Sequence, residues 1–163
     1  STLESHPNML VIKSISKSYG VPGIRLGILC SADTQIISSL KSAVSIWNIN
    51  SFCEYFMQIY TKYEKEYRRA CRKFIEERNL FEQQLRQISF LRIIPSEANY
   101  FLAEVLPPYT ASSLVLKMLK EFNILMRDCS GKQGFDGKQY MRIAVRDHND
   151  NTRLIESLKQ LER

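Results

Sequence analysis

Hydrophobic and polar positions follow two different patterns along this chain. In the first 45 or so residues the apolar positions form short runs, and residues 9–12 and 24–30 are typical of strands bounded by turn residues. Asp33 or Thr34 can cap a helix that runs to about residue 43. From residue 51 onward the apolar positions take on a helical period.

One long helix is expected over residues 51–87. Its apolar positions recur at intervals of three and four, which places them on one face: Phe52, Phe56, Ile59, Tyr63, Tyr67, Ala70 and Phe74. A straight helix of this length measures about 55 Å, more than the diameter of a small domain. We therefore expect it to bridge two domains or to bend near Asn79, and we interpret the aromatic stripe as core.

The second half of the chain alternates between predicted strands and helices. Strands are expected at residues 90–94, 99–105, 124–127 and 140–145. Thr110 can cap a helix that ends near Phe122, and Asn149 or Asn151 can cap a final helix. The inward positions of that last helix are Leu154, Ile155, Leu158 and Leu161. The alternation predicts an α/β domain.

Composition and charge exclude several classes of function. The net charge is +6, but the densest basic segment, residues 62–73, interleaves Glu64 and Glu66 with its bases, so we expect a solvated helix face and no nucleic-acid partner. No apolar run approaches the roughly 20 residues of a membrane helix, and no membrane partner is expected. Four scattered cysteines and two histidines favour reduced thiols in a cytoplasmic protein over a disulfide framework or a zinc site.

The six glycines fall into two groups, which mark two places where the backbone is unusual. The groups are Gly20, Gly23 and Gly27, and Gly131, Gly134 and Gly137. We interpret them as two walls of one site.

Lys17 precedes the first glycine group and lies among hydroxyl residues. A lysine held in a pocket loses its charge more easily, and only a neutral amine attacks a carbonyl carbon. Arg25, eight positions later, has a forked pair of donors suited to a phosphate. The alternative is a surface lysine in a Gly/Pro turn. The whole pattern favours a nucleophile with a phosphate nearby.

The motif at residues 14–27, Ser-x-Ser-Lys-x-x-Gly-x-Pro-Gly-x-Arg-x-Gly, resembles the lysine motif of fold-type I pyridoxal-phosphate enzymes. Within them it is most similar to the class I/II aminotransferases of the histidinol-phosphate aminotransferase and threonine-phosphate decarboxylase branch. The resemblance implies that Lys17 forms the internal aldimine with pyridoxal 5'-phosphate. It also implies that Ser14, Ser16 and Arg25 bind the cofactor phosphate.

Four further segments carry the same resemblance: residues 47–50 (Trp-Asn-Ile-Asn), 95–101, 124–130 (Ile-Leu-Met-Arg-Asp-Cys-Ser) and 140–146. They imply that Asn50, Arg127 and Arg142 bind substrate. A guanidinium grips a carboxylate bidentately, which supports the two arginines independently. The alternative for Arg127 is a structural salt bridge with Asp128 or another acidic residue. Arg146 is expected to be structural or exposed.

The resemblance covers the C-terminal half of such an enzyme. It implies that residues 1–50 end the large cofactor-binding domain, that 51–87 form the interdomain helix, and that 88–163 form the small C-terminal α/β domain. The upstream phosphate loop and the aspartate that pairs with the pyridine nitrogen lie outside this sequence, so we expect the isolated chain to be inactive.

The parent protein is accordingly expected to be a cytoplasmic, homodimeric aminotransferase. It would transfer an amino group between an amino acid or phosphorylated amine and a 2-oxo acid, with Lys17 moving the proton. Two alternatives remain open. One is an amino-acid-phosphate decarboxylase, which differs in the Cα bond held perpendicular to the conjugated plane. The other is an inert folded or dimerisation unit.

Overall fold

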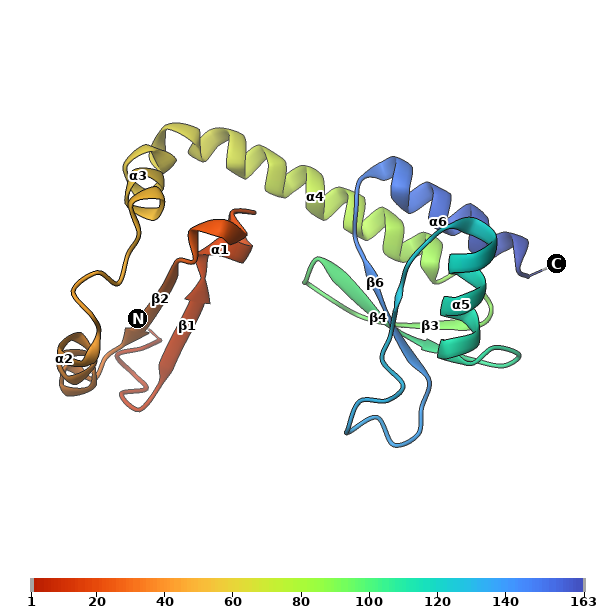
Figure 1. Cartoon of the computed structure of the whole chain (residues 1–163), viewed down its shortest axis with the longest axis horizontal. Helices are drawn as coiled ribbons and strands as arrows, with labels where there is room; N and C mark the ends of the chain where they lie inside the picture. The colour runs from red at the N-terminus through yellow and green to blue at the C-terminus, as the bar shows by residue number, and fades with distance from the viewer. Residues whose placement is uncertain (1, 163) are drawn as a thin grey trace. The chain divides into compact units, whose positions relative to one another are not determined.

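The computed structural model describes residues 2–162 (Figure 1). The chain forms two compact units, Ser1–Arg69 and Ala70–Arg163. The boundary between them falls inside helix α4 (Glu64–Leu85).

The first unit begins with a strand pair joined by the Lys17 motif. Its elements are β1 (Leu10–Ser14), α1 (Ile15–Ser18), the 3₁₀ turn η1 (Pro22–Ile24) and β2 (Gly27–Ser31). β1 and β2 pair antiparallel, with Ser14 opposite Gly27. Both predicted strands are confirmed. The second starts later than expected because Ile24 ends η1 and Arg25 is in a left-handed conformation, with a φ of 52°, that a strand does not allow.

Helix α2 (Thr34–Ala43) confirms the predicted helix and its cap. The side chain of Asp33 accepts hydrogen bonds from the backbone N–H groups of Gln35 at 2.8 Å and Ile36 at 3.1 Å. These are donors that the first turn of a helix cannot satisfy internally.

The predicted long helix is present but interrupted in a different place. α3 (Ser51–Ile59) is followed by the 3₁₀ turn η2 (Tyr60–Tyr63) and then by α4. Asn79, near which a bend was one of the two alternatives, lies inside α4, so the helix is not interrupted there.

The aromatic stripe does not form one buried face. A 3₁₀ turn advances about 120° per residue against about 100° in an α-helix, so the apolar face changes direction at η2. Phe52 and Tyr63 are 81% and 58% exposed, and the core interpretation is wrong for both. Phe74 does pack against the core of the second unit.

The second unit contains an antiparallel four-stranded sheet of order β3-β4-β6-β5. Its elements after α4 are β3 (Leu91–Ile94), β4 (Tyr100–Val105), α5 (Ala111–Phe122), β5 (Arg127–Asp128), β6 (Tyr140–Ala144) and α6 (His148–Gln160). This mixture of helices and strands confirms the α/β class. The strand predicted at residues 124–127 is shorter than expected and is displaced toward Asp128.

One face of this sheet forms the core together with residues from α4, α5 and α6. The alternation along the strands buries every second side chain: Leu91, Ile93, Phe101, Ala103, Met141 and Ile143. Phe81 of α4 meets Phe101 edge to face, with ring centroids 6.1 Å apart. Leu154, Ile155 and Leu158 of α6 are buried as predicted.

Two helix caps show where residue patterns succeed and fail. Thr110 caps α5 as expected, in a reciprocal capping box with Ser113. α6 is capped by Asp147, and the expectation of Asn149 or Asn151 is wrong because the helix already begins at His148. Asn151 is buried instead, and its amide bonds the backbone of Arg146 in both directions.

Substituting Phe81→Ala is expected to lower the free energy of unfolding by about 3–5 kcal/mol, because it removes a fully buried ring and leaves a cavity. Urea titration followed by circular dichroism measures the change. Phe52→Ala removes the same group from an exposed position and should cost far less. Equal losses in the two variants would contradict the assigned core.

Candidate active site

Lys17 lies on the four-residue helix α1, and its side chain is exposed in the first unit. The residue at the start of this helix, Ser14, makes no side-chain cap bond, although its carbonyl accepts a hydrogen bond from the Ser18 hydroxyl at 3.2 Å. Within residues 2–69, therefore, the amine is presented at a surface.

Ser16 is 3% exposed and is bonded to the backbone of a residue ten positions later. Its Oγ accepts from the Leu26 N–H at 3.0 Å and donates to the Leu26 carbonyl at 3.4 Å. A hydroxyl has one proton to donate, and here it is directed at Leu26. Ser16 therefore anchors the motif, which the sequence pattern did not reveal, and its predicted contact with a phosphate stays a prediction.

Arg25 and Asn50 meet at the 3₁₀ turn η1. Arg25 has a φ of 52°, in the left-handed region that disfavours side chains, and its Nη1 donates to the Pro22 carbonyl at 3.2 Å. The Asn50 Nδ2 donates to the Ile24 carbonyl at 2.9 Å, while its Oδ1 caps α3 through Cys53 N–H at 3.0 Å. Asn50 thus ties α3 to the turn that precedes Arg25.

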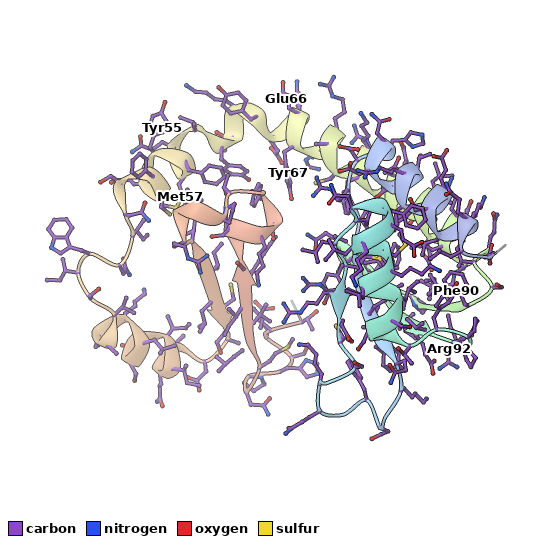
Figure 2. All side chains as sticks on the ribbon, turned by 45° about the vertical axis from the view of Figure 1, so that its right-hand side comes forward. Tyr55, Met57, Glu66, Tyr67, Phe90 and Arg92 are labelled. Atoms are coloured by element: carbon purple, nitrogen blue, oxygen red, sulfur yellow. The ribbon has the colours of Figure 1, made fainter. Side chains whose placement is uncertain are left out.

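Tyr67 contacts the Lys17 turn from α4, and sequence reasoning missed this contact. It lies on the N-terminal part of that helix (Figure 2). Its hydroxyl donates to the Ser18 carbonyl at 3.0 Å, and its ring stacks on Tyr19 with centroids 4.4 Å apart. The only sequence signal was its place in the aromatic stripe.

In the second unit, Arg127 and Arg142 stand directly opposite each other on β5 and β6. Directly opposed residues of an antiparallel pair share one face of the sheet. The Arg142 guanidinium lies 5.4 Å from the ring centroid of Tyr100, a cation–π distance. The structure therefore brings together the two arginines that the sequence singled out.

A cleft of about 850 Å³ opens beside these arginines and is lined by residues from α5, β5, β6 and α6. Two further arginines line it, and both have other partners. Arg146 pairs with Asp150 at 2.5 Å, and Arg153 donates to the Phe122 carbonyl at 2.7 Å. The expectation that Arg146 is structural or exposed is confirmed, since it is both.

Asp128 does not pair with Arg127, which counts against the structural salt bridge considered above. No ion pair within the described residues 2–162 includes Arg127 or Arg142. The Asp128 carboxylate instead accepts hydrogen bonds from the Ser112 hydroxyl and from the Ser130 hydroxyl and N–H. Burial alone would raise the pKa of Asp128, but these bonds outweigh it and lower that pKa below its usual value.

The described part of the chain holds no group of three or more His, Cys, Asp or Glu side chains placed to bind a metal ion. None of its helices combines the length and the apolar character needed to cross a membrane. The expectation that the two glycine groups line one site involves both units and stays a prediction.

Comparison with known proteins identifies the family. The family model "Aminotransferase class I and II" matches residues 1–158. The chain belongs to the class I and II aminotransferases. Members of this family and the related decarboxylases depend on pyridoxal 5'-phosphate.

Three class I/II relatives illustrate the similarity. The chain is 35% identical to an L-serine phosphate decarboxylase from Campylobacter jejuni and 27% identical to a threonine-phosphate decarboxylase from Salmonella typhimurium. It covers 39% and 43% of their lengths, with 93% and 98% of the chain aligned. The solved histidinol-phosphate aminotransferase from Clostridium acetobutylicum superposes with a TM-score of 0.87 at 27% identity, over 98% of this chain and 47% of that one.

These matches confirm the resemblance inferred from the motifs and the fold-type I architecture. The chain spans less than half the length of the curated relatives it matches. The division into residues 1–50, 51–87 and 88–163 stays a prediction.

We expect Asp128→Asn to lower the free energy of unfolding by about 1–2 kcal/mol at neutral pH, because a carboxylate that accepts hydrogen bonds is replaced by a neutral amide. The folded-state pKa of Asp128 is lowered, so its contribution is fully present above the unfolded-state pKa of about 3.9 and is lost as the pH falls through the folded-state pKa.

Urea titrations of both proteins between neutral and strongly acidic pH check this expectation. The two stability curves should approach each other as the pH falls. A difference that stays constant down to the lowest pH would contradict the assigned carboxylate.

Proposed function

We propose that the protein containing this chain is a pyridoxal-phosphate-dependent aminotransferase. It moves an amino group between an amino acid or a phosphorylated amine and a 2-oxo acid. The observation that carries the proposal is the turn of residues 14–27, which presents the amine of Lys17 and the guanidinium of Arg25 from one anchored segment of a class I/II chain.

The donor set of this turn fits the cofactor. The amine of Lys17 can condense with an aldehyde carbon in its neutral form. The exposed Arg25 guanidinium has donors left after its single bond to the Pro22 carbonyl. Ser14, at the end of β1, is exposed as well. Ser16 holds the turn through Leu26 and is assigned to the phosphate with Ser14 and Arg25 by resemblance.

When bound, the cofactor supplies an electron sink that stabilises negative charge on the substrate Cα. Lys17 then acts as the acid and base that moves the proton at that carbon. A lysine Nζ can serve only if its backbone is held in place. The hydrogen bonds between Ser16 and Leu26 provide such a restraint at the start of α1.

Arg127 and Arg142 are assigned to substrate anions. One guanidinium can grip a carboxylate with two parallel hydrogen bonds, which leaves its neighbour for a second anionic group. Arg127 and Arg142 lie side by side, and neither is in an ion pair within residues 2–162. This arrangement favours a substrate that carries both a carboxylate and a phosphate. Asn50 is assigned to substrate by resemblance, beside its cap role.

A decarboxylase of amino-acid phosphates is the second candidate. Two of the relatives above carry that activity in their names, and such an enzyme needs the same lysine and arginines. The two reactions differ in product, since the decarboxylase releases carbon dioxide and the aminotransferase forms a 2-oxo acid.

An inert folded or dimerisation unit is the third candidate, because the chain spans less than half the length of its relatives. We also propose that the protein containing this chain is a homodimer in the cytoplasm.

Sodium borohydride reduction of the protein with pyridoxal 5'-phosphate is expected to fix a pyridoxyl group on Lys17. Peptide mass mapping locates the label, and Lys17→Ala should remove it from the peptide that contains residue 17 while the weaker background on other exposed lysines stays. Lys13→Ala, which removes a lysine from the neighbouring strand β1, serves as the control. Labelling of another lysine with Lys17 unlabelled would overturn the proposal, and no labelling at all would favour the inert unit.

Arg142→Ala is expected to weaken binding of O-phospho-L-serine at least tenfold, because it removes a bidentate ionic contact. Isothermal titration calorimetry on the cofactor-loaded protein measures the dissociation constant. Arg86→Ala, which removes an exposed arginine paired with Glu82 on α4, should leave it unchanged. An unchanged dissociation constant in Arg142→Ala would contradict the assignment of Arg142 to a substrate anion.

In assays with O-phospho-L-serine, carbon dioxide release without a 2-oxo acid product would favour the decarboxylase.

A further inference from the structure

The turn that carries Lys17 is too short to hold its own shape. α1 has four residues, and isolated helices shorter than about 12 residues are marginal in water. Ser14 gives it no side-chain cap bond. The position of Lys17 therefore depends on contacts with more distant parts of the first unit.

The residues before Lys17 are held by Leu26, the residue that precedes β2. The carbonyl of Leu26 accepts from the backbone N–H of Ile15 at 3.0 Å and of Ser16 at 3.3 Å, in addition to the Ser16 hydroxyl bonds described above. This fixes the start of α1.

The residue after Lys17 is held by Tyr67, 49 positions away in sequence from Ser18. The last carbonyls of a helix have no partner within the helix. The Tyr67 hydroxyl supplies one for Ser18 at 3.0 Å. The chain is therefore fixed immediately after Lys17 by a donor from another helix.

The ring of Tyr67 makes a second contact with the same turn. It stacks on Tyr19 with an interplanar angle of 28°. Tyr19 also meets Phe56 and Tyr60 edge-on, at centroid distances of 6.0 and 5.5 Å. Tyr19 is thus enclosed by aromatic rings from α3, η2 and α4, and its backbone has little freedom to move away from Ser18.

We propose that Tyr67 is a positioning residue for Lys17. Its hydroxyl fixes the Ser18 carbonyl and its ring fixes Tyr19, so that Lys17 emerges from a backbone restrained on both sides. The inference rests on the proposed function of Lys17 as the lysine that holds the cofactor.

Tyr67→Phe tests the inference because it removes the hydroxyl and keeps the stacked ring. Tyr63→Phe is the matched control, since it removes the same atom from an exposed ring four residues earlier. Both proteins are reduced with borohydride in the presence of pyridoxal 5'-phosphate. Peptide mapping then gives the label on Lys17 relative to Lys13 and Lys41, which serve as internal standards.

Tyr67→Phe is expected to lower the relative labelling of Lys17 about three- to tenfold, the factor that one hydrogen bond supplies. Tyr63→Phe should stay within about twofold of the unsubstituted protein. Tyr19→Leu, which removes the stacked ring and keeps the hydroxyl bond, should lower Lys17 labelling in the same direction. This second variant keeps the test decisive if Tyr67→Phe fails to fold.

The outcomes separate this inference from the proposed function. If Lys17 is labelled in the unsubstituted protein and equally in both tyrosine-to-phenylalanine variants, the inference alone is overturned. The inference is also overturned if Tyr67→Phe lowers the Tm and changes the labelling of Lys13 and Lys41 as much as that of Lys17. That result would give Tyr67 a general structural role. No labelling of Lys17 in the unsubstituted protein overturns both.

Discussion

The hydrogen bonds between Ser16 and Leu26 are the interaction on which the Lys17 site depends. They join α1 to the residue that precedes β2 and close the loop that contains both Lys17 and Arg25. The Ser16 side chain is buried, so loss of its hydroxyl would leave the Leu26 N–H without its partner at a considerable energetic cost. An amine and a guanidinium can act on one small molecule only while this loop keeps its shape.

The arginines of the second unit depend on strand register in a comparable way. Arg127 opposes Arg142, and Leu102 of β4 opposes Arg142 from the other side. A slip of one residue between β5 and β6 would send the two guanidinium groups to opposite faces. The serine bonds to Asp128, the residue after Arg127, link β5 to α5 and to the turn that follows it, and so oppose such a slip.

The features that could be predicted from sequence are those that depend on near neighbours. Strand alternation, the Asp33 and Thr110 caps and the buried leucines of α6 all follow from residues within a few positions of each other. Motif resemblance singled out the lysine and the two arginines from residues that are close in sequence, and their roles stay predictions. The bonds from Ser16, Asn50 and Tyr67 were not predictable, because each partner lies 10 to 49 residues away. The cap of α6 was predicted at Asn149 or Asn151 and lies at Asp147, because a sequence pattern locates the start of a helix only to within a few residues.

The 3₁₀ turn η2 determines which aromatic ring reaches Tyr19. Rotation accumulates along a helix by about 100° per residue, so the direction in which Tyr67 points is set by the number of residues between it and α3. A deletion within residues 60–63 would rotate Tyr67 by about a quarter of a turn or more, although every residue that it contacts would be unchanged. The length of this segment is therefore expected to be under stronger selection than its composition, and related chains should tolerate substitutions there more readily than insertions.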